Sequence, residues 1–105
     1  MDAWIDVALE AVFPDGTCRR LEVGGRPVAV FNIDGAFYAI EDLCSHQEVN
    51  LSEGELDGLT IICPGHGARF SLVTGEALSP PAYESVLTLP VRVKDGVVQV
   101  CDDQF

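Results

Sequence analysis

The sequence is poor in positive charge: six Lys and Arg residues stand against 17 Asp and Glu residues, for a formal net charge of −11. Proteins that bind nucleic acid contact its phosphates with Lys and Arg, so this deficit argues against a nucleic-acid partner. No stretch approaches the roughly 18 consecutive apolar residues of a transmembrane helix, and the residues from Met1 to Trp4 lack the basic and apolar regions of a signal peptide. We expect a cytoplasmic protein with no membrane segment, and we expect it to be a monomer.

The shortage of basic residues is complete between Pro27 and Ala68, where the sequence contains no Lys or Arg. The acidic residues of this stretch are Asp34, Glu41, Asp42, Glu48, Glu53, Glu55 and Asp57. Such a run has two explanations: a solvated face, or an acidic rim that steers the protein towards basic surfaces of a partner.

The sequence also lacks any long apolar repeat of helical period. Its 105 residues, 48% of them hydrophobic, suffice for one domain with its own core. Short β-rich runs alternate with turn dipeptides such as Gly24-Gly25, Asp34-Gly35 and Asp95-Gly96, which predicts an all-β fold. Pro90 is expected at a sheet edge or a bulge. The predicted strands are Trp4–Ala8, Gly16–Val23, Arg26–Ile33, Ala36–Glu41, Leu59–Ile62, Val86–Lys94 and Val97–Cys101.

Histidine is scarce as well, and each of the two histidines lies within three residues of a cysteine. His46 follows Cys44 and His66 follows Cys63, in the pattern C-x-H-x₁₆-C-x-x-H. A [2Fe–2S] centre with two cysteines on one iron and two histidines on the other needs this set of ligands. The pattern therefore indicates that the four residues are ligands of one metal centre.

Two other interpretations use the same residues. A zinc site can also take two thiolates and two imidazoles, but zinc fingers usually place like ligands together and carry the histidines on a helix. Here each half is mixed, and Pro64, Gly65 and Gly67 disfavour a helix at the second half. The other interpretation is that these are ordinary buried residues with no ligand role, since cysteine is often buried.

Two further cysteines, Cys18 and Cys101, lie in predicted strands. In a cytoplasmic protein such residues stay reduced and pack as small apolar side chains. We expect both to be structural thiols that form no disulfide.

The ligand pattern resembles that of the Rieske family. The resemblance continues through Leu51-Ser52-Glu53-Gly54, Cys63-Pro64-Gly65-His66-Gly67, Phe70 and Thr74-Gly75. It implies an antiparallel β-sandwich base with a small inserted cluster-binding subdomain, at about residues 42–82 of a single domain that spans residues 1–105. It also implies one [2Fe–2S] cluster per chain, with Cys44 and Cys63 on the inner iron and His46 and His66 on the outer iron.

The chain departs from high-potential members of that family at four positions. Those proteins join the ligand loops by a disulfide, and the corresponding positions here resemble Val49 and Gly65. They also donate hydrogen bonds to cluster sulfurs from a serine and a tyrosine, and the corresponding residues here are Ala68 and Phe70. We expect a midpoint potential at the low end of the Rieske range, about −150 mV, that falls at high pH when the imidazoles lose protons.

In function the sequence is similar to the small ferredoxins of bacterial oxygenase systems. This implies a one-electron carrier, not itself an enzyme, between an NAD(P)H-dependent flavoprotein reductase and a terminal ring-hydroxylating dioxygenase of aromatic hydrocarbon catabolism. The exposed edge of His46 or His66 would be the exit point for electrons, with Gln47, Glu48 and the Pro80–Pro81 loop around it. A ferredoxin of a diiron aromatic monooxygenase and a small subunit like that of nitrite reductase are the alternatives.

Overall fold

The computed structural model describes residues 4–44, 49–65, 67–80, 82 and 84–102, and in these ranges every paired strand is antiparallel. None of the helices in the described part of the chain has the length and hydrophobicity of a membrane span. The strands are β1 (Trp4–Leu9), β2 (Cys18–Val23), β3 (Arg26–Ile33), β4 (Ala36–Glu41), β5 (Glu55–Asp57), β6 (Thr60–Ile62), β7 (Arg69–Ser71), β8 (Thr88–Leu89), β9 (Val91–Lys94) and β10 (Val97–Cys101), with short 3₁₀ helices η1 (Glu10–Val12) and η2 (Leu51–Glu53). The predicted all-β class is confirmed.

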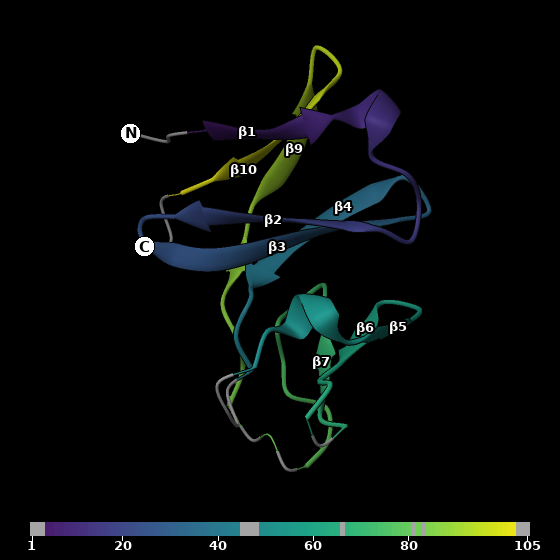
Figure 1. The fold of residues 1–105 in the computed structure, drawn as a ribbon, viewed down its shortest axis with the longest axis vertical. Helices are drawn as coiled ribbons and strands as arrows, with labels where there is room; N and C mark the ends of the chain where they lie inside the picture. Colours follow the sequence, from purple (N-terminus) through teal and green to yellow (C-terminus); the bar gives the residue numbers. More distant parts are fainter. Residues whose placement is uncertain (1–3, 45–48, 66, 81, 83, 103–105) are drawn as a thin grey trace.

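Three sheets follow one another along the longest dimension of the molecule, which measures 40 × 28 × 18 Å (Figure 1). The outer sheet has the order β1-β10-β9, the central sheet β2-β3-β4-β8, and the small sheet β5-β6-β7. The outer and central sheets form the base, and the small sheet lies with η2 at the other end (Figure 1). The chain therefore leaves the base after β4 and returns to it at β8.

Strand β3 explains how the two parts share one framework. Successive side chains of a strand point to opposite faces. Val28 and Val30 pack in the core of the base, whereas Ala29 and Phe31 pack in a second cluster that reaches the small sheet. Because both faces of β3 are covered, the run from Val28 to Phe31 is continuously buried and apolar, where a half-exposed strand would alternate.

The tight hairpins lie where the turn dipeptides predicted them. At Asp34-Gly35 both residues have positive φ, 54° and 86°, and Asp95-Gly96 has 53° and 77°. Two consecutive positive φ values are characteristic of the type I′ turn, whose twist matches that of the flanking strands. These turns set the registers β3–β4 and β9–β10, so the local prediction of both hairpins is confirmed.

The prediction of one strand over Val86–Lys94 is wrong. The segment divides into β8, which ends at Leu89 in the central sheet, and β9, which begins at Val91 in the outer sheet. Pro90 lies between them and has no N–H to donate, while its carbonyl oxygen accepts a hydrogen bond from the Cys101 N–H at 3.0 Å. The proline thus marks the place where the chain changes sheets. The three-residue strands β5 and β7 were not predicted.

Candidate metal centre

Both cysteines of the ligand pattern stand at or near the ends of strands. Cys44 follows β4 by three residues, and Cys63 comes directly after β6. The strands that precede them belong to different sheets, but the two cysteines belong to one cluster of buried residues, in which Cys44 is 3% and Cys63 is 2% exposed. The tertiary structure therefore places two residues that are far apart in sequence in the same buried region.

Backbone hydrogen bonds close the loop that follows each cysteine. The Cys44 N–H donates to the Val49 carbonyl oxygen at 2.9 Å, and the Cys63 N–H donates to the Ala68 carbonyl oxygen at 2.7 Å. Gly67, which has a φ of +75°, donates its N–H to the Cys63 carbonyl oxygen at 3.1 Å. His46 and His66 belong to these two loops by sequence, and both lie outside the described residues. Their role as ligands stays a prediction.

The thiols have the chemistry that an iron–sulfur centre requires. None of the four cysteines is in a disulfide, and deprotonated cysteine is the usual ligand of such clusters. Cys44 and Cys63 supply a pair of buried sulfurs, in line with the two cysteines that the predicted cluster needs on one iron. The donor set of the described residues thus fits the predicted cofactor.

The buried residues that pack around the two cysteines are apolar. Ala68 and Phe70 are both fully buried in the cluster that contains Cys44 and Cys63. Neither side chain carries an N–H or O–H group, so neither can donate a hydrogen bond to sulfur. This placement agrees with the interpretation of Ala68 and Phe70 as residues that replace hydrogen-bond donors.

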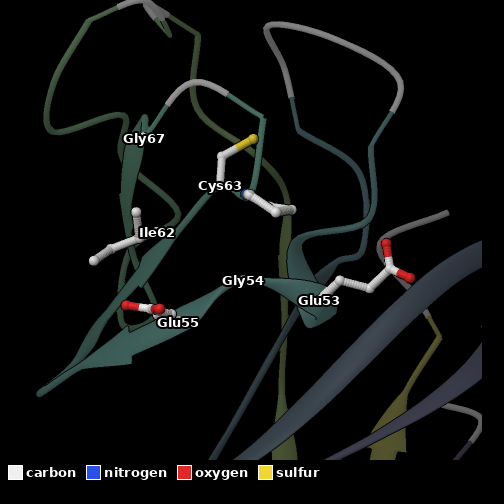
Figure 2. A pocket seen from close by; sticks show the side chains of 7 residues that line it. Glu53, Gly54, Glu55, Ile62, Cys63 and Gly67 are labelled. Carbon is white, nitrogen blue, oxygen red and sulfur yellow. The ribbon is translucent and has the colours of Figure 1, made fainter.

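A cavity of about 340 Å³ opens beside Cys63, between η2 with β5 on one side and the end of β6 on the other (Figure 2). Glu53, Gly54 and Glu55 line it together with Ile62 and Cys63. In Figure 2 the Cys63 thiol points away from the two carboxylates. The exposed side chains of Glu53 and Glu55 therefore give the surface beside this cysteine a negative charge.

The long acidic run does not form one solvated face, as one explanation of the sequence assumed. Asp42 is fully buried. Glu41 pairs with Arg26 at 3.3 Å, and Asp57 pairs with Arg69 at 2.9 Å. The fold thus brings basic residues from outside the run to its acidic residues. The sequence did not predict the burial of Asp42, because nothing in the run distinguishes the buried carboxylate from the exposed ones.

Cys18 lies on β2, outside the ligand pattern. Its Sγ is 3.9 Å from the carbonyl oxygen of Ser52, the geometry of a weak S–H···O contact. Burial raises the pKa of the Cys18 thiol, and the negative charge of Asp42 raises it further. The guanidinium groups of Arg19 and Arg20 act in the opposite direction. Cys18 therefore favours the neutral thiol, as expected for a structural cysteine.

Comparisons with known proteins agree with this site. Residues 3–94 match the family described as the Rieske [2Fe-2S] domain. The chain is 40% identical to ferredoxin CarAc of Metapseudomonas resinovorans over 102 residues, which covers 96% of this chain and 95% of the relative. It is 46% identical over 88 residues to the 3-phenylpropionate/cinnamic acid dioxygenase ferredoxin subunit of Photorhabdus laumondii subsp. laumondii, with 83% of each chain covered.

A solved structure shares the architecture described above. It is the complex of reduced oxygenase and oxidized ferredoxin in carbazole 1,9a-dioxygenase, in which one chain has a TM-score of 0.89 and 41% identity to this chain. The alignment covers 94% of this chain and 93% of that chain. The predicted Rieske-type fold and the predicted [2Fe–2S] cofactor are thereby confirmed. The chain belongs to the Rieske [2Fe-2S] domain family.

Proposed function

We propose that the protein is a ferredoxin that carries single electrons from an NAD(P)H-dependent flavoprotein reductase to the terminal component of a ring-hydroxylating dioxygenase. The observation that carries the proposal is the pair of buried thiols, Cys44 and Cys63, held in one core cluster of a Rieske fold. The relatives named above are ferredoxin components of oxygenase systems, and one structural match is a ferredoxin in complex with its oxygenase. The protein itself then catalyses no reaction on the aromatic substrate.

In this proposal Cys44 and Cys63 ligate one iron and His46 and His66 the other. The ligands lie in the inserted subdomain of about residues 42–82, while the rest of the domain is the supporting base. When bound, the cluster would supply a site for one electron, and the four ligands would leave no open coordination position for substrate. The residues of the chain would hold the cluster and set its potential.

The apolar surroundings support a low midpoint potential. Hydrogen bonds to cluster sulfurs stabilise the added negative charge and so raise the potential. Ala68 and Phe70 offer none from their buried side chains. We therefore propose a midpoint near the low end of the Rieske range, about −150 mV.

Electron delivery requires brief contacts with two partners, the reductase and the oxygenase. Transient redox complexes bury small interfaces, typically below about 1,200 Å² in total. The exposed carboxylates of Glu53 and Glu55 beside Cys63 favour partners with basic surfaces. We place the carrier in the cytoplasm as a monomer, where thiols such as that of Cys18 stay reduced.

The test begins with the purified protein, assayed for iron, acid-labile sulfide and the visible and EPR spectra of a Rieske centre. The reduced protein is then mixed in a stopped-flow instrument with the oxidised terminal oxygenases of the carbazole, naphthalene and 3-phenylpropionate systems. Rapid oxidation by at least one of them is expected, whereas a colourless zinc-containing protein would refute the proposal. His46→Ala and His66→Ala should each abolish the normal Rieske spectrum, and a normal spectrum in either variant would refute that ligand.

A further inference from the structure

The carboxylate of Asp42 is the one charged side chain, among the residues the structure describes, that is completely buried. A buried ionised group is costly unless hydrogen bonds and opposite charge compensate it. Asp42 directly follows β4 and stands two residues before Cys44. Two residues of chain span at most about 7 Å, so the carboxylate belongs to the immediate support of the first ligand segment.

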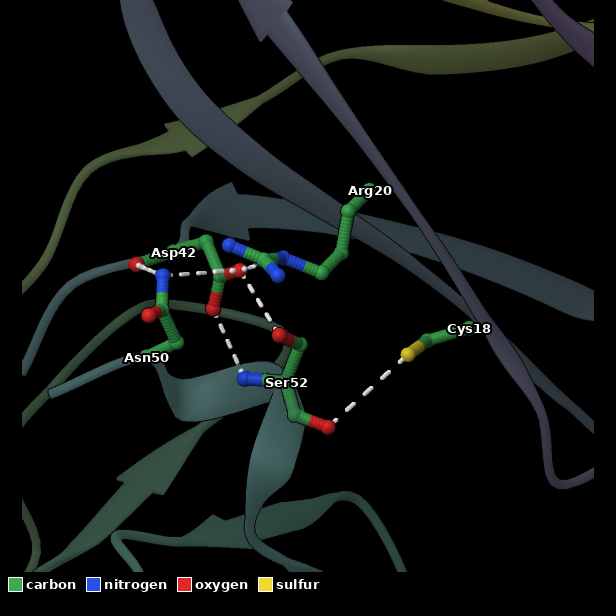
Figure 3. Close-up of polar contacts among 5 residues, drawn as sticks. All are labelled: Cys18, Arg20, Asp42, Asn50 and Ser52. Atoms are coloured by element: carbon green, nitrogen blue, oxygen red, sulfur yellow. Dashed lines mark hydrogen bonds and ion pairs between the residues drawn. The ribbon is translucent and has the colours of Figure 1, made fainter.

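The partners of Asp42 come from two other elements (Figure 3). Ser52 of η2 donates its backbone N–H to Oδ1 at 2.7 Å and its hydroxyl to Oδ2 at 2.7 Å. Arg20 of β2 donates its Nε–H to Oδ2 at 2.8 Å. Asn50, just before η2, donates its side-chain amide to the Asp42 backbone carbonyl oxygen at 3.1 Å. One carboxylate therefore joins the base, the first ligand segment and η2.

Neighbouring contacts also connect the base, the first ligand segment and η2. The Asp42 N–H donates to the Pro27 carbonyl oxygen at 2.9 Å, which ties the segment to the central sheet. On β2, Cys18 and Arg20 are two residues apart and thus share a face. Cys18 contacts Ser52 of η2, and Arg20 contacts Asp42. Leu51, the first residue of η2, is buried in the cluster with Cys44 and Cys63.

We propose that Asp42 is the positioning residue of the first ligand segment: its carboxylate holds the chain before Cys44 against η2 and β2, so that Cys44 presents its thiol to the cluster from a fixed place. The inference rests on the proposed function, because a fixed position matters only if this segment binds the cluster. It goes beyond the four ligands, since Asp42 acts through Cys44 without contributing a ligand atom.

The contacts of Arg20 and of Ser52 should contribute unequally to holding the Asp42 carboxylate in place. The Arg20 side chain is 53% exposed, so solvent screens its ion pair with Asp42. Ser52 makes two short hydrogen bonds with the buried carboxylate, and one of them uses a backbone N–H that cannot change its role to acceptor. In Asp42→Asn, one of the two oxygens becomes an NH₂ group that would face a donor of Ser52 or Arg20. The expected order of effects is Asp42→Asn, then Ser52→Ala, then Arg20→Gln.

The experiment measures how fast the holoprotein loses its cluster in excess chelator, followed as bleaching of the visible absorbance. A hydrogen bond to a charged group changes an equilibrium by about ten- to hundredfold, so Asp42→Asn should speed the loss by at least about tenfold and Ser52→Ala by severalfold. Ser52→Thr keeps the hydroxyl and should retain the wild-type rate. Asp57→Asn is the matched control, because Asp57 forms an exposed ion pair with Arg69 in the small sheet, and it should have no effect.

A second control separates positioning from a general loss of stability. Val98→Ala removes volume from the core of the base, so it should lower the Tm and leave both the rate of cluster loss and the EPR g-values unchanged. Asp42→Asn should shift the g-values of the reduced protein. The proposal is overturned if Asp42→Asn behaves like Asp57→Asn, or if Val98→Ala accelerates cluster loss as much.

The remaining outcomes are equally decisive. If Asp42→Asn does not fold, the comparison of Ser52→Ala with Ser52→Thr decides, and equal rates in the two overturn the proposal. If the wild-type protein binds no [2Fe–2S] cluster, the proposed function fails. If the wild type binds it and all the network variants match the wild type, only the positioning role of Asp42 fails.

Discussion

Gly54 follows η2, and its backbone packs closely against the end of β6, so Gly54→Ala should disturb the metal centre. Its backbone has a φ of −82° and a ψ of −175°, which any L-residue adopts, so alanine meets no conformational penalty. A methyl group at this position would, however, overlap the Ile62 carbonyl oxygen and approach the Leu51 carbonyl oxygen to 3.2 Å. Ile62 directly precedes Cys63. Relief of the overlap must therefore move η2 or the end of β6.

The change in the free energy of unfolding caused by Gly54→Ala is the balance of two opposing effects. Forcing an extra methyl into a packed site costs about 1–3 kcal/mol, while replacing glycine with alanine gains about 0.4–1 kcal/mol by restricting the unfolded chain. The overlap is with backbone atoms, which cannot turn aside as a flexible side chain could, so the cost should outweigh the gain. For a domain of this size each kcal/mol lost lowers the Tm by about 4–8 °C.

The assay combines thermal unfolding, followed by circular dichroism, with the visible spectrum and the rate of cluster loss. Gly25→Ala is the control: Gly25 has a φ of +80° and open space around it, so alanine strains only the β2–β3 turn, away from the metal centre. Both variants should have a lower Tm, but only Gly54→Ala should alter the spectrum and accelerate cluster loss. A Gly54→Ala protein with wild-type Tm and spectrum would refute this reasoning about the close backbone approach.

Three further outcomes are expected. Phe70→Tyr should raise the midpoint potential by roughly 40–50 mV if the new hydroxyl reaches a cluster sulfur, because hydrogen bonds to charged acceptors are about 1 kcal/mol stronger than those to neutral ones; an unchanged potential in protein-film voltammetry would count against Phe70 as the missing donor. The midpoint should fall at alkaline pH as the imidazoles of His46 and His66 lose protons in the oxidised protein, and a flat profile would exclude this coupling. Alkylation of Cys18 by iodoacetamide should reach half its maximal rate at a higher pH than alkylation of an exposed cysteine, since burial raises the pKa of this thiol. Because the pKa of this thiol is raised in the folded state, its contribution to stability is present below the pKa of the unfolded chain and is lost as the pH rises through the pKa of the folded protein. Reaction of Cys18 at the rate of an exposed thiol would contradict the prediction.

Local chemistry made much of the fold readable from the sequence. The hairpins at Asp34-Gly35 and Asp95-Gly96 follow from the preference of these residues for positive φ, which depends on the turn itself and on nothing distant. The long strands β3 and β4 have the predicted bounds because their apolar runs are bordered by such turns. The ligand pattern around Cys44 and Cys63 could also be recognised without coordinates, because it consists of particular residue types at a fixed spacing.

Other elements depend on partners that are distant in sequence. The three-residue strands β5 and β7 are too short to have a period of their own, and they form by pairing with the two edges of β6. The segment Val86–Lys94 reads as one alternating strand, but its two halves pair with β4 and β10 in different sheets. Such pairing depends on where the chain folds back, and local strand propensity does not predict this.

The sequence by itself determined the family, the all-β class and the residues proposed to hold the cluster, because these depend on residue types at fixed spacings. Only the tertiary structure decided that Asp42, one acidic residue among many in its stretch, is buried and bound by Ser52 and Arg20. It also decided that Gly54 must lack a side chain, since its neighbour is a carbonyl oxygen of β6. Burial and close approach arise between segments that meet only on folding, so composition and spacing do not reveal them.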